Sequence, residues 1–469
     1  MRRYFDGVVF RSQLRAIAVA SIVAFTPIGG GCGDDETDGP STGGAGGAGG
    51  AEETGGSGGA GGGGGAANND PLGLDQCDAT LPSLDTAVAL PAMSWESIDD
   101  QEVNCAFRAL DAALADKRIL CSGEGDHGVA QSSRWHSLLV RYLVHRWNVR
   151  VIAYEMPGAD IEPWDRFLTS GDPDDLEQGF ISTDGTLAGV VENESLLQAF
   201  RNVQLELPEG DRIRLVGFDI SVQTEATLTA LEAFLDVVAP SEVETLMTSL
   251  TTGTLQERAT AAGELATQIE AEEAEYTAAT DEARWRAARR DARNLQDGYN
   301  FLFYYQAGDY GTGNAGYREP GMIRNMEEIA ASTPAEERVL MISHDFHCAK
   351  AVPAGGAANI EESPAVGTHL AMSETWGPQY AVIGQHYMEG THLTFTGEDD
   401  FSAFASGLET AIGNATNEPA IIVGMGSTWL DFDKNWPVLA NGQNAGLINP
   451  SEQYDAVLWL REATPTTPR

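Results

Sequence analysis

The sequence predicts an α/β fold in which a central, mostly parallel β-sheet is flanked by helices and carries a helical insertion subdomain. Two observations lead to this prediction. Compact apolar runs of strand length recur along the chain, and an amphipathic helix separates the first two, which is the βαβ order of a parallel sheet. A long stretch that is nearly free of glycine and proline then separates the third apolar run from the fourth.

The first elements follow from helical spacing and turn residues. We expect a helix over residues 95–116, because Ser94 can cap it and apolar side chains recur at every third or fourth position. A strand over residues 118–124 ends in a glycine-rich turn. An amphipathic helix over residues 132–146 then leads to a second strand at 149–156.

The remaining strands are short apolar runs of the kind that is covered on both faces of a sheet. They are expected at residues 213–220, 339–343, 380–384, 420–423 and 456–460. Residues 224–305 are rich in Ala, Glu, Leu and Arg, which favours helices. We interpret this stretch, about 223–310 with its flanks, as a helical insertion that forms either one wall of a cleft or a purely structural helical pair.

The N-terminus has the pattern of an export signal. Residues 1–32 contain early arginines, an apolar run from residue 16 to 28 that is too short to span a bilayer, and three glycines before Cys32. Small residues before a cysteine resemble a lipobox, so Cys32 is the predicted lipidation site, with cleavage by the general signal peptidase as the alternative. Residues 33–72 are a Gly/Ala/Ser-rich flexible tether. We expect an exported protein anchored as a lipoprotein on the periplasmic or cell-surface side, with the N-terminal lipid as its only membrane contact.

The charge and the cysteines limit the possible partners and cross-links. A net charge of −42 excludes a nucleic-acid partner, because a phosphate backbone would be repelled. Beyond Cys32 the chain has four cysteines, which an exported protein can join in two disulfides whose pairing the sequence does not give: Cys77, Cys105, Cys121 and Cys348. Cys121 and Cys348 each lie beside the end of a predicted strand, so either a bridge between them or two buried thiols fits. Oligomeric state is not predicted.

Two familiar motifs carry no function here. The G-x-S-x-G pattern of serine hydrolases matches only around Ser41 and Ser57, inside the tether, where no rigid strand and helix would hold a nucleophile. A G-x-G-x-x-G pattern begins at Gly311, but no strand precedes it, and we interpret it as a loop rather than a dinucleotide site.

Acidic and imidazole side chains gather at predicted strand ends. Glu124 and His127 follow the first strand, Glu155 closes the second, and His344 and His347 follow the fourth. Because the carboxyl ends of parallel strands share one edge of a sheet, these five groups are expected to converge there. Two carboxylates and three imidazoles in one pocket can shift each other's pKa and transfer protons near neutral pH.

These residues also carry a family resemblance. Gly123-Glu-Gly-Asp-His-Gly128, followed by a helix with Arg134 and a strand ending in Glu155, resembles the erythromycin esterase family. Arg318-Glu-x-x-Met322-x-x-Asn325, Ser343-His-Asp-Phe-His347 and Val366-Gly-Thr-His-Leu370 resemble its later motifs, so the likeness covers about residues 105–465 of an expected domain over 73–466. Three positions depart from the pattern: Asp126 replaces Thr, Asp345 replaces Asn, and His136 stands where a second arginine is common.

The resemblance implies a hydrolase that cleaves an ester or lactone with His127 as the general base. Glu124 and Glu155 would orient and polarise the site, and His344 and His347 would complete it. Arg134, His136 and His369 are the candidate substrate-binding residues, although Arg134 would equally suit an exposed salt bridge. We expect no obligatory cofactor, with a divalent metal as the open alternative. Macrolide resistance is one role for such an enzyme, and a haem- or metal-binding lipoprotein that uses the same histidines is the competing hypothesis.

Overall fold

The computed structural model describes residues 70–78, 80, 82–90, 100–183, 188–220, 225–351, 364–394, 397–440 and 443–469. Apart from Asp70, the described residues belong to one compact unit, Pro71–Arg469. The predicted signal peptide, Cys32 and residues 33–69 of the predicted tether lie outside the described residues. Within the described part, no helix combines the length and the apolar character needed to cross a membrane.

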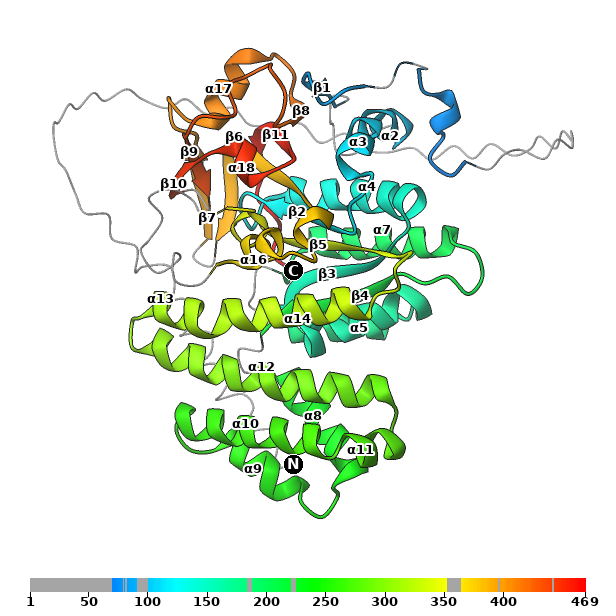
Figure 1. Cartoon of the computed structure of the whole chain (residues 1–469), viewed down its shortest axis with the longest axis vertical. Coiled ribbons are helices and arrows are strands. Elements are labelled where there is room, and N and C mark those ends of the chain that lie inside the picture. The colour runs from blue at the N-terminus through cyan, green and yellow to red at the C-terminus, as the bar shows by residue number, and fades with distance from the viewer. Residues whose placement is uncertain are drawn as a thin grey trace, which may run out of the picture. The chain divides into compact units, whose positions relative to one another are not determined.

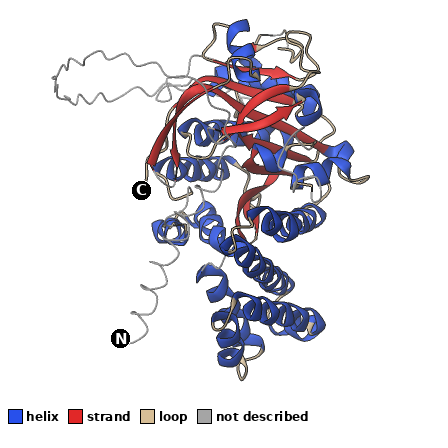
Figure 2. Cartoon of the chain, turned by 90° about the vertical axis from the view of Figure 1, so that its left-hand side faces the viewer, coloured by secondary structure: helices blue, strands red, loops and turns tan. Residues whose placement is uncertain are grey.

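Nine of the described strands form one central sheet (Figures 1 and 2). Its order is β1-β8-β11-β6-β2-β5-β3-β4, and β7 pairs with β6 outside this path. The strands are β1 (Val88–Ala89), β2 (Ile119–Glu124), β3 (Val149–Pro157), β4 (Arg214–Asp219), β5 (Arg338–His344), β6 (Tyr380–Thr394), β7 (Gly397–Ser402), β8 (Ala420–Gly424) and β11 (Ala456–Ala463). Six neighbouring strands from β11 to β4 are parallel, which confirms the predicted fold class.

The apolar strands are buried on both faces because their side chains alternate between two cores. Leu120 of β2 belongs to one core, while Ile119 and Cys121 belong to the other. The first core is covered by helices α4 (Ala130–Trp147), α5 (Gly158–Ser170), α6 (Pro173–Ser182) and α7 (Val191–Glu206). The second is covered by α14 (Glu319–Ser332), α16 (Val366–Met372) and α17 (Leu408–Ala415).

Two predicted elements have other bounds than expected. In place of one helix over residues 95–116, the structure has α2 (Asp100–Phe107), the 3-10 turn η2 (Arg108–Leu110) and α3 (Asp111–Leu114), while residues 91–99 are not described. β6 continues ten residues beyond the predicted strand, because β11 pairs with it as far as Gly390 and β7 pairs with residues 389–394 as a hairpin. Further short elements are η1 (Leu74–Gln76), α15 (Asp345–Cys348), η4 (Gly377–Gln379), α18 (Pro450–Gln453) and a separate hairpin of β9 (Trp436–Ala440) and β10 (Gln443–Ile448).

The insertion after β4 is helical, as the sequence predicts, and builds its own core. It consists of α8 (Glu225–Val238), α9 (Val243–Thr251), α10 (Leu255–Ala271), α11 (Glu273–Ala279) and α12 (Glu282–Gln306), seen in green in Figure 1. Leu231, Leu265 and Trp285 pack together from three of these helices. The chain returns to the sheet through α13 (Tyr310–Gly313), the π-helix η3 (Asn314–Arg318) and α14. The G-x-G-x-x-G segment from Gly311 therefore lies in helical turns, and its interpretation as a loop was wrong.

Candidate active site

The carboxyl ends of β2, β5 and β3 bring the predicted acidic and imidazole groups together. Glu124 of β2 lies opposite His344 of β5 in the parallel register, and Glu155 of β3 is on the other side of β5. The rings of His127 and His344 have centroids 5.0 Å apart. Segments more than two hundred residues apart in the chain therefore meet at one edge of the sheet, where α/β proteins bind ligands.

Glu124 and His127 form a hydrogen-bonded pair. His127 Nδ1 lies 3.0 Å from Glu124 Oε2, and because a carboxylate only accepts, Nδ1–H donates. The side chain of His127 is 35% exposed, so water can reach the imidazole. Removal from bulk water lowers the pKa of His127, but the hydrogen bond to Glu124 and the charge of Glu155 outweigh this, so the pKa lies above its ordinary value.

His136 lies behind Glu124 in the protein interior. Its Nδ1 is 3.6 Å from Glu124 Oε1, and its Nε2 is 3.1 Å from Ser122 Oγ. The side chain is fully buried, and burial lowers the pKa of His136 to about 4, against the smaller opposing effect of Glu124. The residue predicted to bind substrate is thus a neutral imidazole that backs the Glu124 carboxylate and has no exposed surface.

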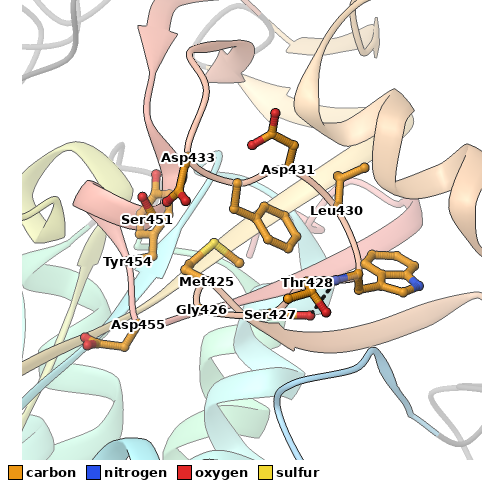
Figure 3. Close-up of a pocket in the computed structure, with 12 residues that line it drawn as sticks. Met425, Gly426, Ser427, Thr428, Leu430, Asp431, Asp433, Ser451, Tyr454 and Asp455 are labelled. Atoms are coloured by element: carbon orange, nitrogen blue, oxygen red, sulfur yellow. Dashed lines mark hydrogen bonds between the residues drawn. The ribbon is translucent and has the colours of Figure 1, made fainter.

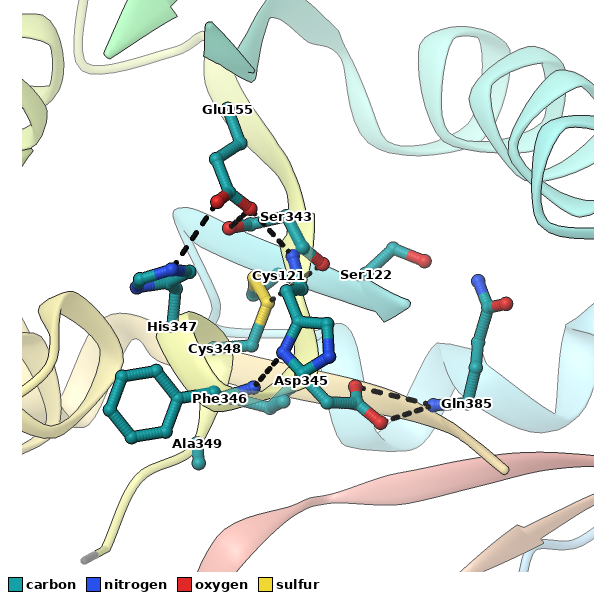
Figure 4. Close-up of a disulfide and its surroundings, with 12 residues drawn as sticks. Cys121, Ser122, Glu155, Ser343, Asp345, Phe346, His347, Cys348, Ala349 and Gln385 are labelled. Carbon is teal, nitrogen blue, oxygen red and sulfur yellow. Dashed lines mark hydrogen bonds and ion pairs between the residues drawn. A yellow bond between two sulfur atoms is a disulfide. The ribbon is translucent and has the colours of Figure 1, made fainter. Parts of the chain in front are cut away.

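Glu155 is the centre of a second group of polar contacts (Figure 4). Its Oε2 accepts hydrogen bonds from Ser343 Oγ at 2.7 Å and from the backbone N–H of His344 at 2.8 Å. Its Oε1 accepts from Arg318 Nη2 at 2.7 Å. Arg318 also binds Asp219 with Nε and Nη2, at 3.1 and 2.7 Å. Glu155 therefore ties β5 and the π-helix to the end of β3.

His347 is held between two carboxylates. Its Nδ1 is 2.9 Å from Glu319 Oε1 and its Nε2 is 3.3 Å from Glu155 Oε1. Burial lowers the pKa of His347, but Glu319 and Glu155 together raise it to about 10. Burial raises the pKa of Glu155, yet His347 and Arg318 hold it well below its usual range. Two carboxylates favour the imidazolium form of His347 against one guanidinium, whose Nη1 lies 3.3 Å from His347 Nε2, so His347 is not assigned as a base.

Three members of this charged group were not predicted as site residues: Asp219, Arg318 and Glu319. Asp219 ends β4, so the rule that strand ends carry function includes it. Arg318 and Glu319 begin a motif that the family resemblance already contained. No sequence rule foresees the π-helix that presents them to β3 and β5, because this distortion adds one residue to a helical turn.

His344 and Asp345 turn the chain at the end of β5. His344 Nδ1 accepts a hydrogen bond of 3.1 Å from the backbone N–H of Phe346, so in the neutral ring the proton is on Nε2. Asp345 is buried, and its carboxyl accepts a hydrogen bond from the backbone N–H of Gln385. Burial raises the pKa of Asp345 to about 7. A Cβ on Gly123 would lie 1.6 Å from Asp345 Oδ1, so this carboxyl fits only against glycine.

The turn that carries His127 is fixed from two sides. Gly128 has a positive φ of 79°, and a Cβ there would lie 2.0 Å from the carbonyl oxygen of Leu393. The Gly128 carbonyl accepts from the N–H groups of Leu393 and Thr466, at 3.0 and 2.8 Å. Asp126, a departure from the family pattern, is buried 2.5 Å from His392 Nδ1 on β6. This turn is therefore rigid before any substrate arrives.

A disulfide between Cys121 and Cys348 lies directly beneath the site (Figure 4). It joins the middle of β2 to the end of α15, next to His347, across 227 residues of sequence. A second described disulfide joins Cys77 to Cys105. Of the alternatives that the sequence leaves open for Cys121 and Cys348, the structure has the bridge.

The other predicted binding residues lie elsewhere. His369 of α16 forms an ion pair of 3.0 Å with Glu327 of α14, and its side chain is 36% exposed. Among the described residues, no recorded contact joins His369 to the five converging groups. Arg134 is half-buried in the second turn of α4, and its role remains a prediction.

A cavity of about 720 Å³ lies at the opposite end of the sheet (Figure 3). It is formed by the loop after β8 and the residues before β11, including Ser427, Asp431 and Tyr454. Since Tyr454 precedes the amino end of β11, this cavity is separate from the carboxyl edge that carries His127. Among the described residues, no group of three or more His, Cys, Asp and Glu side chains has an arrangement suited to a metal ion.

A mostly parallel sheet with a paired carboxylate and imidazole at its carboxyl edge defines the class of α/β enzymes that carry an acid–base site. Within this class, the chain belongs to the erythromycin esterase family, whose model matches residues 144–463. Membership in this family supports a hydrolase. The match includes Glu155, Arg318, His344 and His347, and it begins after Glu124 and His127.

Solved structures share the fold at low sequence identity. A Bacillus cereus protein has 14% identity and a TM-score of 0.65, covering 82% of this chain and 97% of its own. A succinoglycan biosynthesis protein has 15% identity and a TM-score of 0.64 with the same coverage. A variant of the erythromycin esterase EreC in its open conformation has 17% identity and a TM-score of 0.63, covering 78% of this chain and 95% of its own. No curated protein matches the sequence.

Proposed function

We propose that this protein hydrolyses a carboxylic ester or a lactone with a water molecule that His127 activates. The observation that supports this proposal best is the hydrogen bond between Glu124 Oε2 and His127 Nδ1. It makes Nδ1 the donor, so Nε2 is the basic nitrogen of the neutral ring. A hydrolase acting on an ester is also the activity that the family resemblance implies.

The reaction has two steps. In the first, water attacks the carbonyl carbon, His127 Nε2 takes a proton from that water, and the carbonyl π electrons move to oxygen. In the second, the tetrahedral intermediate collapses, the bond to the alcohol oxygen breaks, and the imidazolium of His127 returns the proton to that oxygen. Glu124 stabilises the imidazolium between the two steps, and the neutral His136 behind it keeps the carboxylate in place.

The negative charge on the intermediate needs a hydrogen-bond donor in a fixed position. His344 has this property, because Phe346 N–H donates to its Nδ1 and the neutral ring then carries its proton on Nε2. The ring lies beside His127, with centroids 5.0 Å apart. We assign His344 to the oxyanion, and Arg318, Glu155 and His347 to holding β3, β5 and the π-helix in register.

A divalent cation fits these residues poorly. The Arg318 guanidinium already lies between Glu155 and Asp219, and both nitrogens of His347 face carboxylates. The proposal therefore uses no metal, and a chelator provides a test.

The test uses the chain from residue 70 onward with a panel of ester, lactone and macrolide substrates, with and without chelator. Wild-type protein should turn over at least one ester or lactone, and His127→Gln should lose about two to four orders of magnitude in kcat. His145→Gln, which changes a largely buried imidazole that pairs with the partly exposed Glu206 at the end of α7, should retain full activity. Turnover that survives His127→Gln would contradict the mechanism. Stoichiometric metal or haem, with no turnover of any substrate, would favour the metal- or haem-binding lipoprotein.

We propose further that the protein is exported and held at a membrane by lipid on Cys32. The apolar run before three glycines and Cys32 supports this, and two disulfides suit an oxidising compartment. Metabolic labelling with a palmitate analogue should label wild-type protein and not Cys32→Ser. Equal labelling of both proteins would refute the lipid anchor.

A further inference from the structure

Four tyrosines gather where the helical insertion returns to the sheet, and we call them the tyrosine edge: Tyr304, Tyr305, Tyr310 and Tyr317. Tyr304 and Tyr317 stack with ring centroids 5.7 Å apart, and Tyr305 and Tyr310 meet at 6.3 Å. Tyr305 and Tyr317 pack on a small core that contains Phe301. The cluster thus combines residues from the end of α12, from α13 and from the π-helix. The label α13 marks this place in Figure 1.

The tyrosine edge adjoins the active site. Tyr317 directly precedes Arg318, whose guanidinium binds Glu155 and Asp219. Asn314, in the same π-helix, donates a hydrogen bond of 3.3 Å to Glu319, the partner of His347. Tyr310 is close to the same charges: the surrounding protein raises the pKa of Tyr310, Arg318 lowers it, and Glu319 raises it. One segment of ten residues, from Tyr310 to Glu319, therefore carries both aromatic rings and site charges.

Two properties of the edge bear on ligand binding. Tyr310 is 44% exposed although it is a large ring. The hydroxyl of Tyr305 and Oδ1 of Asn314 are buried, and neither has a hydrogen-bond partner among the described residues. A buried polar atom without a partner is costly, and native proteins keep few of them, often where a ligand supplies the missing partner.

We propose that the tyrosine edge binds the substrate, and that the substrate is an uncharged ester whose alcohol part carries a hydroxylated aromatic ring. The exposed face of Tyr310 would stack on this ring, since aromatic pairs attract beyond their buried area. A shift of the Tyr310 ring, which meets Tyr305 at 6.3 Å, would uncover the buried hydroxyl of Tyr305, and the hydroxyl of the ligand ring would then pair with it. An uncharged ligand suits a protein whose net charge of −42 repels anions. This inference rests on the proposed ester hydrolysis at His127.

Three acetate esters with alcohols of similar acidity separate ring stacking from hydroxyl recognition: 2-(4-hydroxyphenyl)ethyl, 2-phenylethyl and 2-cyclohexylethyl acetate. For wild-type protein, kcat/KM should fall in this order, by about tenfold for loss of the hydroxyl and about fivefold for loss of the aromatic ring. Tyr305→Phe should make the first two esters equal and keep the preference for phenyl over cyclohexyl. Tyr310→Leu should remove that second preference.

The matched control is Tyr276→Phe, a tyrosine of the same insertion whose hydroxyl accepts from Gln268 within the helical core. It should leave all three ratios unchanged. If Tyr305→Phe and Tyr310→Leu keep the wild-type ratios of kcat/KM while His127→Gln is inactive, the tyrosine edge does not bind the substrate. The proposed hydrolysis would then still stand. Activity that survives His127→Gln would instead overturn the proposed hydrolysis.

A binding measurement covers the case in which none of these esters is turned over. Saturation-transfer NMR with 2-(4-hydroxyphenyl)ethanol as the probe should give a signal with wild-type protein and with Tyr276→Phe, and a weaker one with Tyr305→Phe and Tyr310→Leu. Equal signals for all four proteins, or none with wild type, would refute the site.

Discussion

One hydrogen bond decides which nitrogen of His127 is basic. Glu124 accepts from Nδ1, so Nε2 is the basic nitrogen of the neutral ring, and the same carboxylate would stabilise the ring if Nε2 took up a proton, as the proposed mechanism requires. The pKa of His136 is instead lowered, because this ring is fully buried and has no strong carboxylate contact, so it stays neutral. The pKa values of two histidines on either side of one carboxylate are therefore shifted in opposite directions.

The first prediction concerns the pH dependence of the base. Since the pKa of His127 is raised and the base must be deprotonated, the acidic limb of kcat/KM should lie above pH 6.5. Glu124→Gln removes the main cause of the shift, so the limb should move to lower pH while kcat at pH 8 falls about 10- to 100-fold. His145→Gln is the control and should keep the wild-type limb. If the acidic limb of kcat/KM stays at the same pH in Glu124→Gln, a group other than His127 causes that limb.

The second prediction concerns the carboxyl that departs from the family pattern. The pKa of Asp345 is raised from 3.8 to about 7, so the folded state binds a proton that the unfolded chain has released between these values, and stability falls as the pH rises through that window. Asp345→Asn keeps the acceptor for Gln385 N–H and removes the buried charge. The variant should match wild type at pH 4 and be more stable at pH 8 by roughly 1–4 kcal/mol in urea denaturation. Equal stability at pH 8 would contradict this assignment.

At the scale of elements, the helix α15, which follows His344 and carries His347, is only four residues long. α15 has too few residues to fix itself, so its position depends on the disulfide to β2 and on the hydrogen bonds of Glu155. The π-helix on the other side supplies Arg318 and Glu319. The site is therefore assembled from short elements that long strands and cross-links hold in place.

The third prediction tests the cross-link. Cys121→Ala combined with Cys348→Ala should lower kcat about tenfold, because α15 is then free to shift, and should destabilise the fold by about 2–5 kcal/mol. Cys77→Ala combined with Cys105→Ala should reduce stability and leave kcat unchanged, since that bridge lies outside the site. Thermal melts and steady-state kinetics measure both effects. A normal kcat in the first variant would mean that hydrogen bonds alone position α15.

The fourth prediction tests the π-helix through its last residue. Arg318→Lys keeps the charge but cannot bind Asp219 with two nitrogens and reach Glu155 at the same time. The variant should lose about 2–4 kcal/mol of stability and most of its kcat, with a smaller change in KM. The matched control is Arg324→Lys, which changes an ion pair between Arg324 of α14 and Asp297 of α12. Equal effects of the two variants would remove the special role of Arg318.

At the scale of the whole molecule, the charge of −42 makes self-repulsion a global property. The fifth prediction is that raising NaCl from 10 to 200 mM at pH 7.5 increases the melting temperature, because salt screens like charges on the surface. The same change in salt near the isoelectric point, about 4.3, should have little effect. A melting temperature that falls with salt at pH 7.5 would mean that attractive ion pairs dominate.

The same scale explains why the strands were predictable. A strand covered on both faces must be apolar throughout, and this shows in its own few residues. The apolar runs around Leu120, Ile152 and Leu340 can therefore be recognised without knowing which strands lie beside them. The helical insertion was equally visible, because intrinsic propensity acts within each turn. The extension of β6 was not, since residues 385–394 form a strand because β11 lies beside them as far as Gly390 and β7 from Glu389 onward.

The sequence by itself determined the α/β class, the family and the convergence of Glu124, His127, Glu155, His344 and His347, because parallel strands must end at a common edge. Only the tertiary structure decided what each group does. Burial made His136 neutral, two carboxylates raised the pKa of His347, and a π-helix brought Arg318 and Glu319 to them. The reason is physical: the position of a strand end follows from local pattern, whereas the charge of a side chain depends on neighbours that are distant in the chain.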